Sequence, residues 1–181
     1  MSALMCSFDR VKVQNYEYLI FVVFWNDFET PLTKQLRNMT ISFGGAIEDR
    51  GFVVLPFEKA SIETAQQVTS KLWPDEVKQR FGIEQDPFML VINRDFQEFD
   101  PRQHQWAIVW FSEYQANPDQ VTRVFGRILR ITQLGSNLFD HFKANKKKEW
   151  YKKWAKFFEV KPAIFGVSVD AKGLLEETLG L

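Results

Sequence analysis

The segment that most constrains the fold of this chain is the apolar run at residues 18–25. Its letters, YLIFVVFW, are all aliphatic or aromatic. A strand with one face in water alternates apolar and polar residues, whereas a strand covered on both faces reads as a continuous apolar run. We therefore expect a central strand with helices packed on both faces of its sheet, which is an α/β architecture.

Helices and strands are expected to alternate after this strand. Pro31 suits the first turn of a helix, where its missing N–H is not needed. Gly44-Gly45 is expected to end that helix through positive φ angles, and Ser61 to cap the next one. In chain order, the sequence predicts a helix from residue 31 to 43, a strand at 52–57, a helix at 61–72, a short helix at 75–81, and strands at 88–93 and 106–111.

The last two of these strands and the helix after them complete the expected core. The strands look antiparallel, because they are joined by an Asp- and Pro-bearing loop that is only somewhat longer than a tight hairpin. Asn117-Pro118-Asp119 reads as a cap, a first-turn proline and a first-turn acid. The helix that follows is predicted to bury one face, formed by Val121, Val124, Phe125, Ile128 and Leu129.

The nine residues at 24–32, FWNDFETPL, resemble the active-site segment of the thioredoxin family. That family reads Phe-Trp, any residue, an acid, an aromatic residue and then Cys-Gly-Pro-Cys. Glu29 and Leu32 stand where the two cysteines would be, while Pro31 keeps the proline between them. The resemblance therefore implies a thioredoxin-like protein that has lost its dithiol chemistry.

A second segment, FGIEQDPFMLVI at residues 81–92, resembles another part of the same family. There an aromatic-Gly-Ile stretch precedes a proline and an apolar strand, and the proline is cis and faces the cysteine pair. The resemblance implies a cis bond between Asp86 and Pro87. It also implies a groove lined by Trp25, Phe28, Glu29, Thr30, Pro31, Leu32, Asp86, Pro87 and Phe88.

The resemblance predicts a thioredoxin-like domain at residues 1–135 and an extension at 136–181 packed on the same domain. Thioredoxin-like folds hold an extended client segment along the groove beside the proline, so a chain without thiols is expected to bind a protein partner without reacting. An alternative is a small-ligand binder or enzyme similar to the glutathione transferases. The extension looks too short for the helical domain of that family.

Few of the side chains outside this groove suggest chemistry. Glu29 and Asp86 would face each other in the resemblance and could share a proton, but two acids without a base favour a binding protein over an enzyme. His104 and His141 have no ligands at metal spacing, so we expect neither a metal nor a cofactor. Cys6 is the only cysteine, which excludes an internal disulfide.

Charge and hydropathy set the expected location and class of partner. Lys plus Arg equals Asp plus Glu at 23 each, so no global field attracts nucleic acid or an anionic membrane. No secretory leader is recognised, and the run at 18–25 is too short to span a bilayer. We expect a cytoplasmic protein without a transmembrane segment.

The segment at residues 143–161 is strongly basic, with eight lysines against two glutamates. On a helix, five aromatic residues would lie opposite Lys146, Lys148, Lys152, Lys153 and Lys156. Such a helix commonly packs its aromatic stripe on its own domain, and the alternative is that it binds a partner, an anionic lipid surface or nucleic acid. The strand predicted at 163–169, before a closing helix at 171–179, should pair at a sheet edge, in its own chain or across a homodimer.

Overall fold

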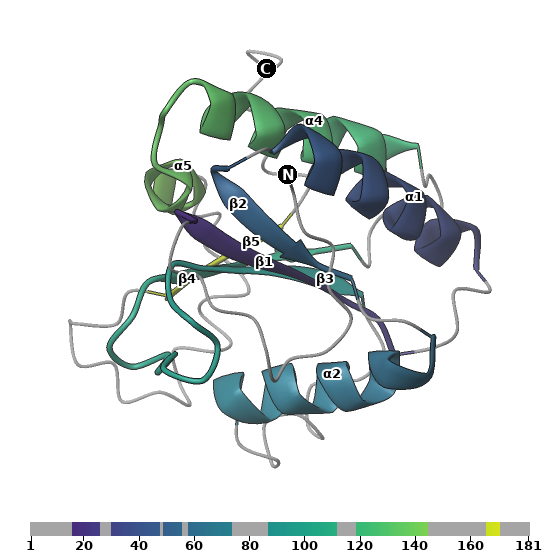
Figure 1. Cartoon of the computed structure of the whole chain (residues 1–181), viewed down its shortest axis with the longest axis horizontal. Coiled ribbons are helices and arrows are strands. Elements are labelled where there is room, and N and C mark those ends of the chain that lie inside the picture. The colour runs from purple at the N-terminus through teal and green to yellow at the C-terminus, as the bar shows by residue number, and fades with distance from the viewer. Residues whose placement is uncertain are drawn as a thin grey trace.

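The computed structural model describes residues 16–25, 30–47, 49–55, 58–73, 87–111, 119–144 and 166–170. Five strands and four helices lie within these ranges (Figure 1). They are β1 (Tyr18–Val23), α1 (Pro31–Ala46), β2 (Gly51–Val54), α2 (Glu58–Leu72), β3 (Phe88–Ile92), β4 (Trp106–Trp110), α4 (Gln120–Gln133), α5 (Leu138–Ala144) and β5 (Gly166–Asp170).

The strands form one mixed sheet in the order β2-β1-β3-β4-β5. β1 runs parallel to β2 and antiparallel to β3. β3 runs antiparallel to β4, as the sequence predicts, and β4 is parallel to β5. The continuous apolar run of β1 therefore occupies an inner position, between β2 and β3, and all six of its residues are buried.

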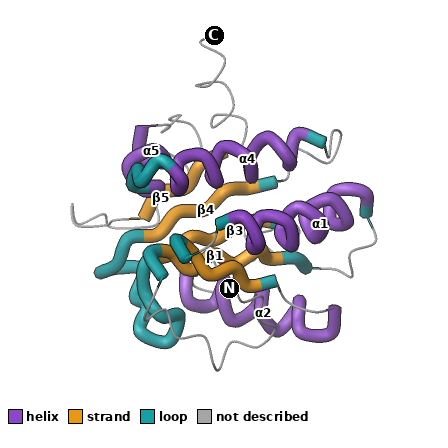
Figure 2. Tube along the Cα trace, turned by 45° about the horizontal axis from the view of Figure 1, so that its top comes forward, coloured by secondary structure: helices purple, strands orange, loops and turns teal. Residues whose placement is uncertain are grey.

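Helices cover both faces of the sheet (Figures 1 and 2). The first face carries α1, α4 and α5, and successive residues of β1 alternate between the two faces. On the first face, Ile20 and Val22 of β1 meet Leu36 of α1 and Phe125 of α4. On the second face, Leu19 and Phe21 meet residues of α2 such as Val68. The α/β architecture with a mixed sheet flanked by helices is thus confirmed.

Two helix boundaries differ by three residues from the predicted ones. α1 continues through Gly44-Gly45 to Ala46, and neither glycine ends it. Phe43 and Ile47 on both sides of the pair are buried in the core, and that packing outweighs the poor helix propensity of glycine. α2 begins at Glu58, three residues before the predicted cap at Ser61.

The glycine that does take a positive φ is Gly135, at the end of α4. Its N–H donates to the carbonyl of Thr132, and the N–H of Ser136 donates to the carbonyl of Ile131. This pattern satisfies carbonyl groups in the last turn of α4. The chain can then reverse into α5, where the side chain of Asn137 accepts a hydrogen bond from the N–H of Phe139.

Two connections cross the first face of the sheet. β1 leads through α1 to its parallel neighbour β2, and β4 leads through α4 and α5 towards its parallel neighbour β5. β1 and β4 point the same way because each is antiparallel to β3. β2 and β5 lie on opposite sides of these strands, at the two edges of the sheet.

The C-terminal part of the chain is described only at α5 and β5. The strand predicted after Pro162 is found at the edge of the sheet of its own chain, beside β4. The basic segment, with Lys146, Lys148, Lys152, Lys153 and Lys156, lies outside the described residues, as do the helices predicted at 75–81 and 171–179.

Candidate functional site

The register between β1 and β3 brings the two thioredoxin-like segments to one end of the sheet. Val23 is paired with Phe88 at the last position of the ladder. The next residue of the first segment is Phe24 and the preceding residue of the second is Pro87, so these two positions continue the same register. The segment that leaves β1 and the proline that enters β3 are therefore neighbours, although more than sixty residues separate them.

The side chains at this end of the sheet differ in their access to solvent. Thr30 and Pro31 are exposed, and Trp25 is half-buried. Leu32, at the position of a lost cysteine, is only 3% exposed and belongs to the core of the first face. Pro87 and Phe88 are buried as well. The ring of Phe88 therefore belongs to the core beneath the site and adds no exposed area to it.

Thr30 sets the position at which α1 begins. Its side chain accepts a hydrogen bond from the N–H of Thr33 (3.1 Å), and the Thr33 hydroxyl donates back to the Thr30 carbonyl (3.0 Å). Pro31 follows in the first turn, as the sequence predicts. The capping role of Thr30 was not predicted, although a threonine followed by a proline at the start of a helix is a recognisable signal.

An aromatic cluster stands behind the candidate site on the second face. Trp73, directly after α2, stacks on Trp110 of β4 with ring centroids 5.9 Å apart. Phe88 lies 5.1 Å from Trp110 and 6.1 Å from Trp73. Trp25 packs against the same apolar face. Its indole N–H is buried and has no hydrogen-bond partner within the described residues.

Three of the predicted groove residues, Phe28, Glu29 and Asp86, lie outside the described residues. The proposed pair of carboxylates and the cis bond between Asp86 and Pro87 stay predictions for the same reason. Within the part of the chain that the structure describes, no group of three or more His, Cys, Asp or Glu side chains could hold a metal ion. His104 instead accepts a hydrogen bond at Nδ1 from the N–H of Asp100 (3.0 Å).

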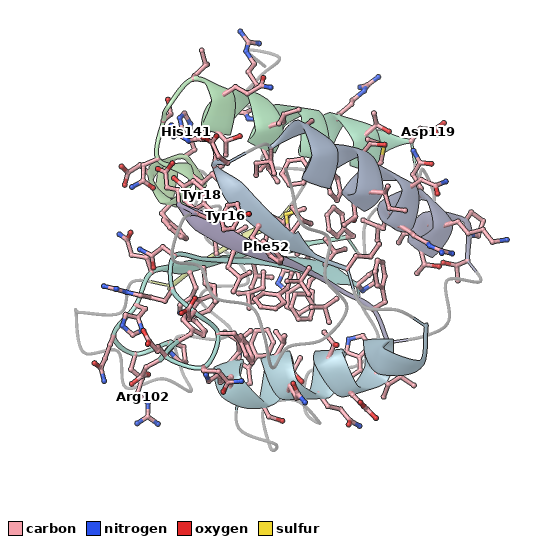
Figure 3. The ribbon with its side chains drawn as sticks, viewed as in Figure 1. Tyr16, Tyr18, Phe52, Arg102, Asp119 and His141 are labelled. Carbon is pink, nitrogen blue, oxygen red and sulfur yellow. The ribbon has the colours of Figure 1, made fainter. Side chains whose placement is uncertain are left out.

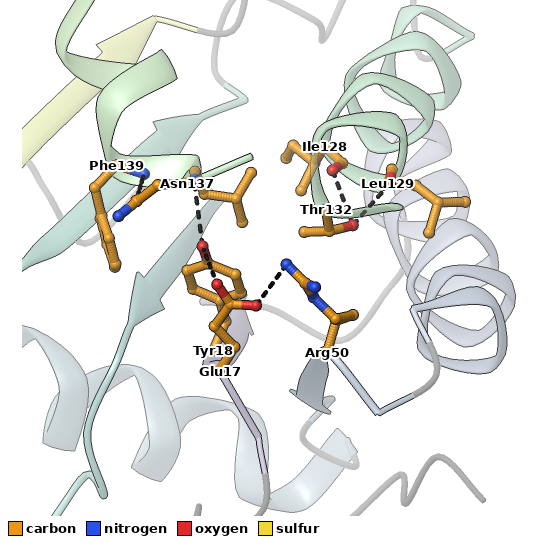
Figure 4. Close-up of polar contacts among 9 residues, drawn as sticks. Glu17, Tyr18, Arg50, Ile128, Leu129, Thr132, Asn137 and Phe139 are labelled. Carbon is orange, nitrogen blue, oxygen red and sulfur yellow. Dashed lines mark hydrogen bonds and ion pairs between the residues drawn. The ribbon is translucent and has the colours of Figure 1, made fainter. Parts of the chain in front are cut away.

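Two polar contacts far from the candidate site join distant parts of the chain, and the sequence did not predict either. Near the start of β1, the N–H of Leu138 donates to the hydroxyl of Tyr18 (3.2 Å), which donates to Glu17 (3.1 Å) (Figure 4). Glu17 in turn forms an ion pair with Arg50 (2.7 Å). Burial is the main cause that raises the pKa of Tyr18, and the negative charge of Glu17 adds to it.

The second contact joins α2 to the loop between β3 and β4. The ammonium group of Lys71 donates to the carbonyls of Phe96 and Gln97, and it lies 4.6 Å from the centroid of the Phe96 ring. Burial lowers the pKa of Lys71, and the nearby charge of Asp100 opposes that effect. No sequence pattern predicts this contact, because it joins a helix to a loop 25 residues further along the chain.

Comparison of the chain with protein-family models, with curated proteins and with solved structures found no match. No helix in the described ranges is both long and apolar enough to cross a membrane.

Proposed function

We propose that this protein is a redox-inactive, thioredoxin-like module that binds a partner protein through an extended segment at the end of the sheet where β1 ends and β3 begins. The observation that carries the proposal is the register of β1 and β3, which makes Phe24 and Pro87 neighbours. Two segments resemble the thioredoxin active site and its proline, and the fold brings them to one place.

The architecture supports the thioredoxin-like assignment. A mixed sheet in the order β2-β1-β3-β4, with α1 and α4 on one face and α2 on the other, is a mixed central sheet flanked by helices, as the resemblance implies. α1 also starts where the resemblance requires, with Pro31 in its first turn directly after the segment that leaves β1.

The side chains at the site favour binding over catalysis. Leu32 is aliphatic and buried where a thiol would be needed. Thr30 and Pro31 present an exposed rim, and Trp25 offers a half-buried ring whose N–H lacks a partner among the described residues. An exposed rim beside a half-buried aromatic ring fits the recognition of an extended peptide segment.

An affinity capture with matched variants tests the proposal. Pro31→Arg introduces a long charged side chain on the exposed rim. Gln133→Arg is the control, because it introduces the same side chain at an exposed position at the end of α4. We expect a partner captured by the unaltered protein and by Gln133→Arg to be lost with Pro31→Arg. A partner retained equally by both variants would place recognition elsewhere on the molecule.

The loss of redox chemistry has its own test. We expect the purified protein to show no reduction of insulin disulfides above background, because Cys6 is its only thiol. Glu29→Cys combined with Leu32→Cys should create a dithiol-disulfide couple if the segment keeps the thioredoxin geometry. Turnover by the unaltered protein would refute the redox-inactive assignment, and stabilisation by glutathione in a thermal melt would favour the glutathione-transferase-like alternative.

A further inference from the structure

The two long helices on the first face contain basic residues and no acidic ones. α1 and α4 comprise 16 and 14 residues, and at the average of the chain, 23 acids in 181 residues, they would together hold about four Asp or Glu. They hold none. Their charged residues are Lys34, Arg37, Arg123, Arg127 and Arg130. α2 on the opposite face has mixed charge, with Glu58 and Glu63 beside Lys59 and Lys71.

Three of the arginines and an exposed leucine form one line along α4. Arg123, Arg127, Arg130 and Leu134 follow a spacing of four, three and four residues, which places them on one side of a helix. Arg123 and Arg130 are exposed and Arg127 is half-exposed. Within the described residues, the side chains of Arg123 and Arg130 form no hydrogen bond or ion pair, whereas Arg127 has a further contact. The nearest acid in the sequence is Asp119, just before α4.

The same layer exposes apolar side chains. Leu134 is 71% exposed, and Ile41 on α1 is 48% exposed. The other large apolar side chain that the described ranges leave exposed is Ile62 (46%), on α2 at the opposite face. The phenylalanines of the layer, Phe43 and Phe125, are buried. α1 and α4 therefore present no exposed ring on which single-stranded nucleic acids could stack.

We propose that this basic face, formed by Lys34, Ile41, Arg123, Arg127, Arg130 and Leu134, docks on a membrane surface that contains anionic phospholipid. The guanidinium groups would contact lipid phosphates, and Leu134 and Ile41 would enter the headgroup region. α1 and α4 lie side by side over the sheet and form a broad layer (Figures 1 and 2). The segment at 143–161 continues the chain beyond α5 with the same sign of charge, at eight lysines to two glutamates.

Vesicle sedimentation with the full chain tests this docking. The probe is a vesicle of phosphatidylcholine with about one third phosphatidylserine, compared with pure phosphatidylcholine at about 0.05 M and about 0.5 M salt. We expect binding to the anionic vesicle only, and weaker binding at high salt. Each basic residue near such a surface contributes about 1 kcal/mol, or about fivefold. The double reversal Arg123→Glu with Arg130→Glu should therefore lower the partition coefficient by at least about 25-fold.

A matched control makes the same charge change on the other side of the molecule. Arg94 and Arg102 are exposed in the loop between β3 and β4, and Figure 3 shows Arg102 at the opposite side of the sheet from Asp119. Arg94→Glu with Arg102→Glu should keep most of the binding, because the contact surface is intact. Equal losses in the two double variants would show that only net charge matters and would overturn the proposal.

The apolar contribution and the basic segment are tested in the same assay. Leu134→Ser should weaken vesicle binding severalfold, whereas Ile62→Ser, at an exposed site on α2 at the opposite face, should not. If reversing Lys148, Lys152 and Lys156 abolishes binding while Arg123→Glu with Arg130→Glu leaves it unchanged, the segment at 143–161 binds alone and the proposal is wrong. Absence of binding to anionic vesicles at low salt, or retardation of RNA in its place, would overturn it as well.

Discussion

The two faces of the sheet are buried by different means. On the first face, three helices supply mostly aliphatic and phenylalanine side chains, and the ring of Phe125 stacks on Phe111 and meets Phe43 edge-on. On the second face, the described helix is α2 alone, and four tryptophans, Trp25, Trp73, Trp106 and Trp110, pack in or against the core cluster. Large aromatic side chains bury more area per residue than aliphatic ones, and indole rings are the largest of them.

The two faces also differ in the polar contacts that hold their helices in place. Tyr18 joins β1 to the backbone of α5 on the first face, and Lys71 joins α2 to the β3–β4 loop on the second. The first contact is buried and the second is half-exposed. The candidate groove lies at the end of the sheet backed by the tryptophans of the second face, whereas the basic face is the outer surface of the first. The two proposals thus concern different surfaces of the molecule.

The largest expected effect concerns which chain supplies β5 to the edge of the sheet, the same chain or a second copy. Ala107 and Val167 are register partners on neighbouring parallel strands, and strand spacing of about 4.7 to 4.9 Å permits a disulfide there. In a Cys6→Ser background, Ala107→Cys with Val167→Cys should oxidise within one chain, giving a monomer on a non-reducing gel. Ala107→Cys alone is the control.

A covalent dimer from the double variant would mean that β5 is exchanged between two copies. Each copy would then complete the sheet of the other by domain swapping.

The next prediction compares the loss of stability when one aromatic side chain is removed from each face. Phe125→Ala removes a ring that contacts Phe43 and Phe111 and is 1% exposed. We expect the free energy of unfolding to fall by about 3 to 5 kcal/mol. Trp110→Ala on the second face should cost less, because that ring is only half-buried. Urea denaturation of both variants measures the difference, and an equal or larger loss at Trp110 would reverse the ranking of the faces.

Removal of one hydroxyl tests the contact that fastens the first face. Tyr18→Phe keeps the ring contact with Phe139 but leaves the buried N–H of Leu138 without an acceptor. An unsatisfied buried amide costs about 1 to 3 kcal/mol, so the unfolding midpoint should fall accordingly. Glu17→Gln removes the charge of the exposed pair with Arg50 but keeps a side-chain oxygen that can accept from the Tyr18 hydroxyl, so it should cost less than about 1 kcal/mol. A smaller loss for Tyr18→Phe than for Glu17→Gln would show that the hydroxyl does not hold α5.

The sequence predicts the parts of the fold that depend on local pattern. The apolar runs place β1, β3 and β4 within one or two residues, and the spacing of apolar residues identifies the buried face of α4. The helix end predicted at Gly44-Gly45 is wrong, because the packing of Phe43 and Ile47 outweighs the low helix propensity of glycine. The contacts of Tyr18 with Leu138 and of Lys71 with Phe96 could not be predicted, because they join residues 120 and 25 positions apart.

A smaller effect is expected at the rim of the candidate site. Thr30→Ala removes the cap of α1 and should cost about 1 kcal/mol, whereas Thr30→Ser keeps a hydroxyl and should cost little. Because the cap lies beside Pro31, Thr30→Ala also shows whether the site needs an ordered start of the helix. Partner capture that survives Thr30→Ala but not Pro31→Arg would assign recognition to the exposed rim and not to the cap.

The smallest effect is a difference in pH dependence between the two faces. The pKa of Lys71 is lowered from its ordinary value of 10.5, so the unfolded chain binds more protons than the folded one between the lowered pKa and 10.5. Stability should rise with pH across that window. The pKa of Tyr18 is raised from its ordinary value of 10.0, so the folded chain binds more protons above pH 10.0. That contribution to stability is complete below pH 10.0 and is lost as the pH rises through the higher folded value.

Single variants separate these opposite slopes. Urea midpoints measured between about pH 7 and pH 11 give the pH dependence, provided that the denaturant slope m stays constant. Lys71→Met should remove the gain in stability that precedes pH 10.5, because residue 71 then binds no proton in either the folded or the unfolded chain. Tyr18→Phe should remove the fall above pH 10.0. If the stability of both variants depends on pH as that of the unaltered protein does, the pKa values of Tyr18 and Lys71 do not differ between the folded and the unfolded chain. The two contacts would then contribute equally at every pH in this range.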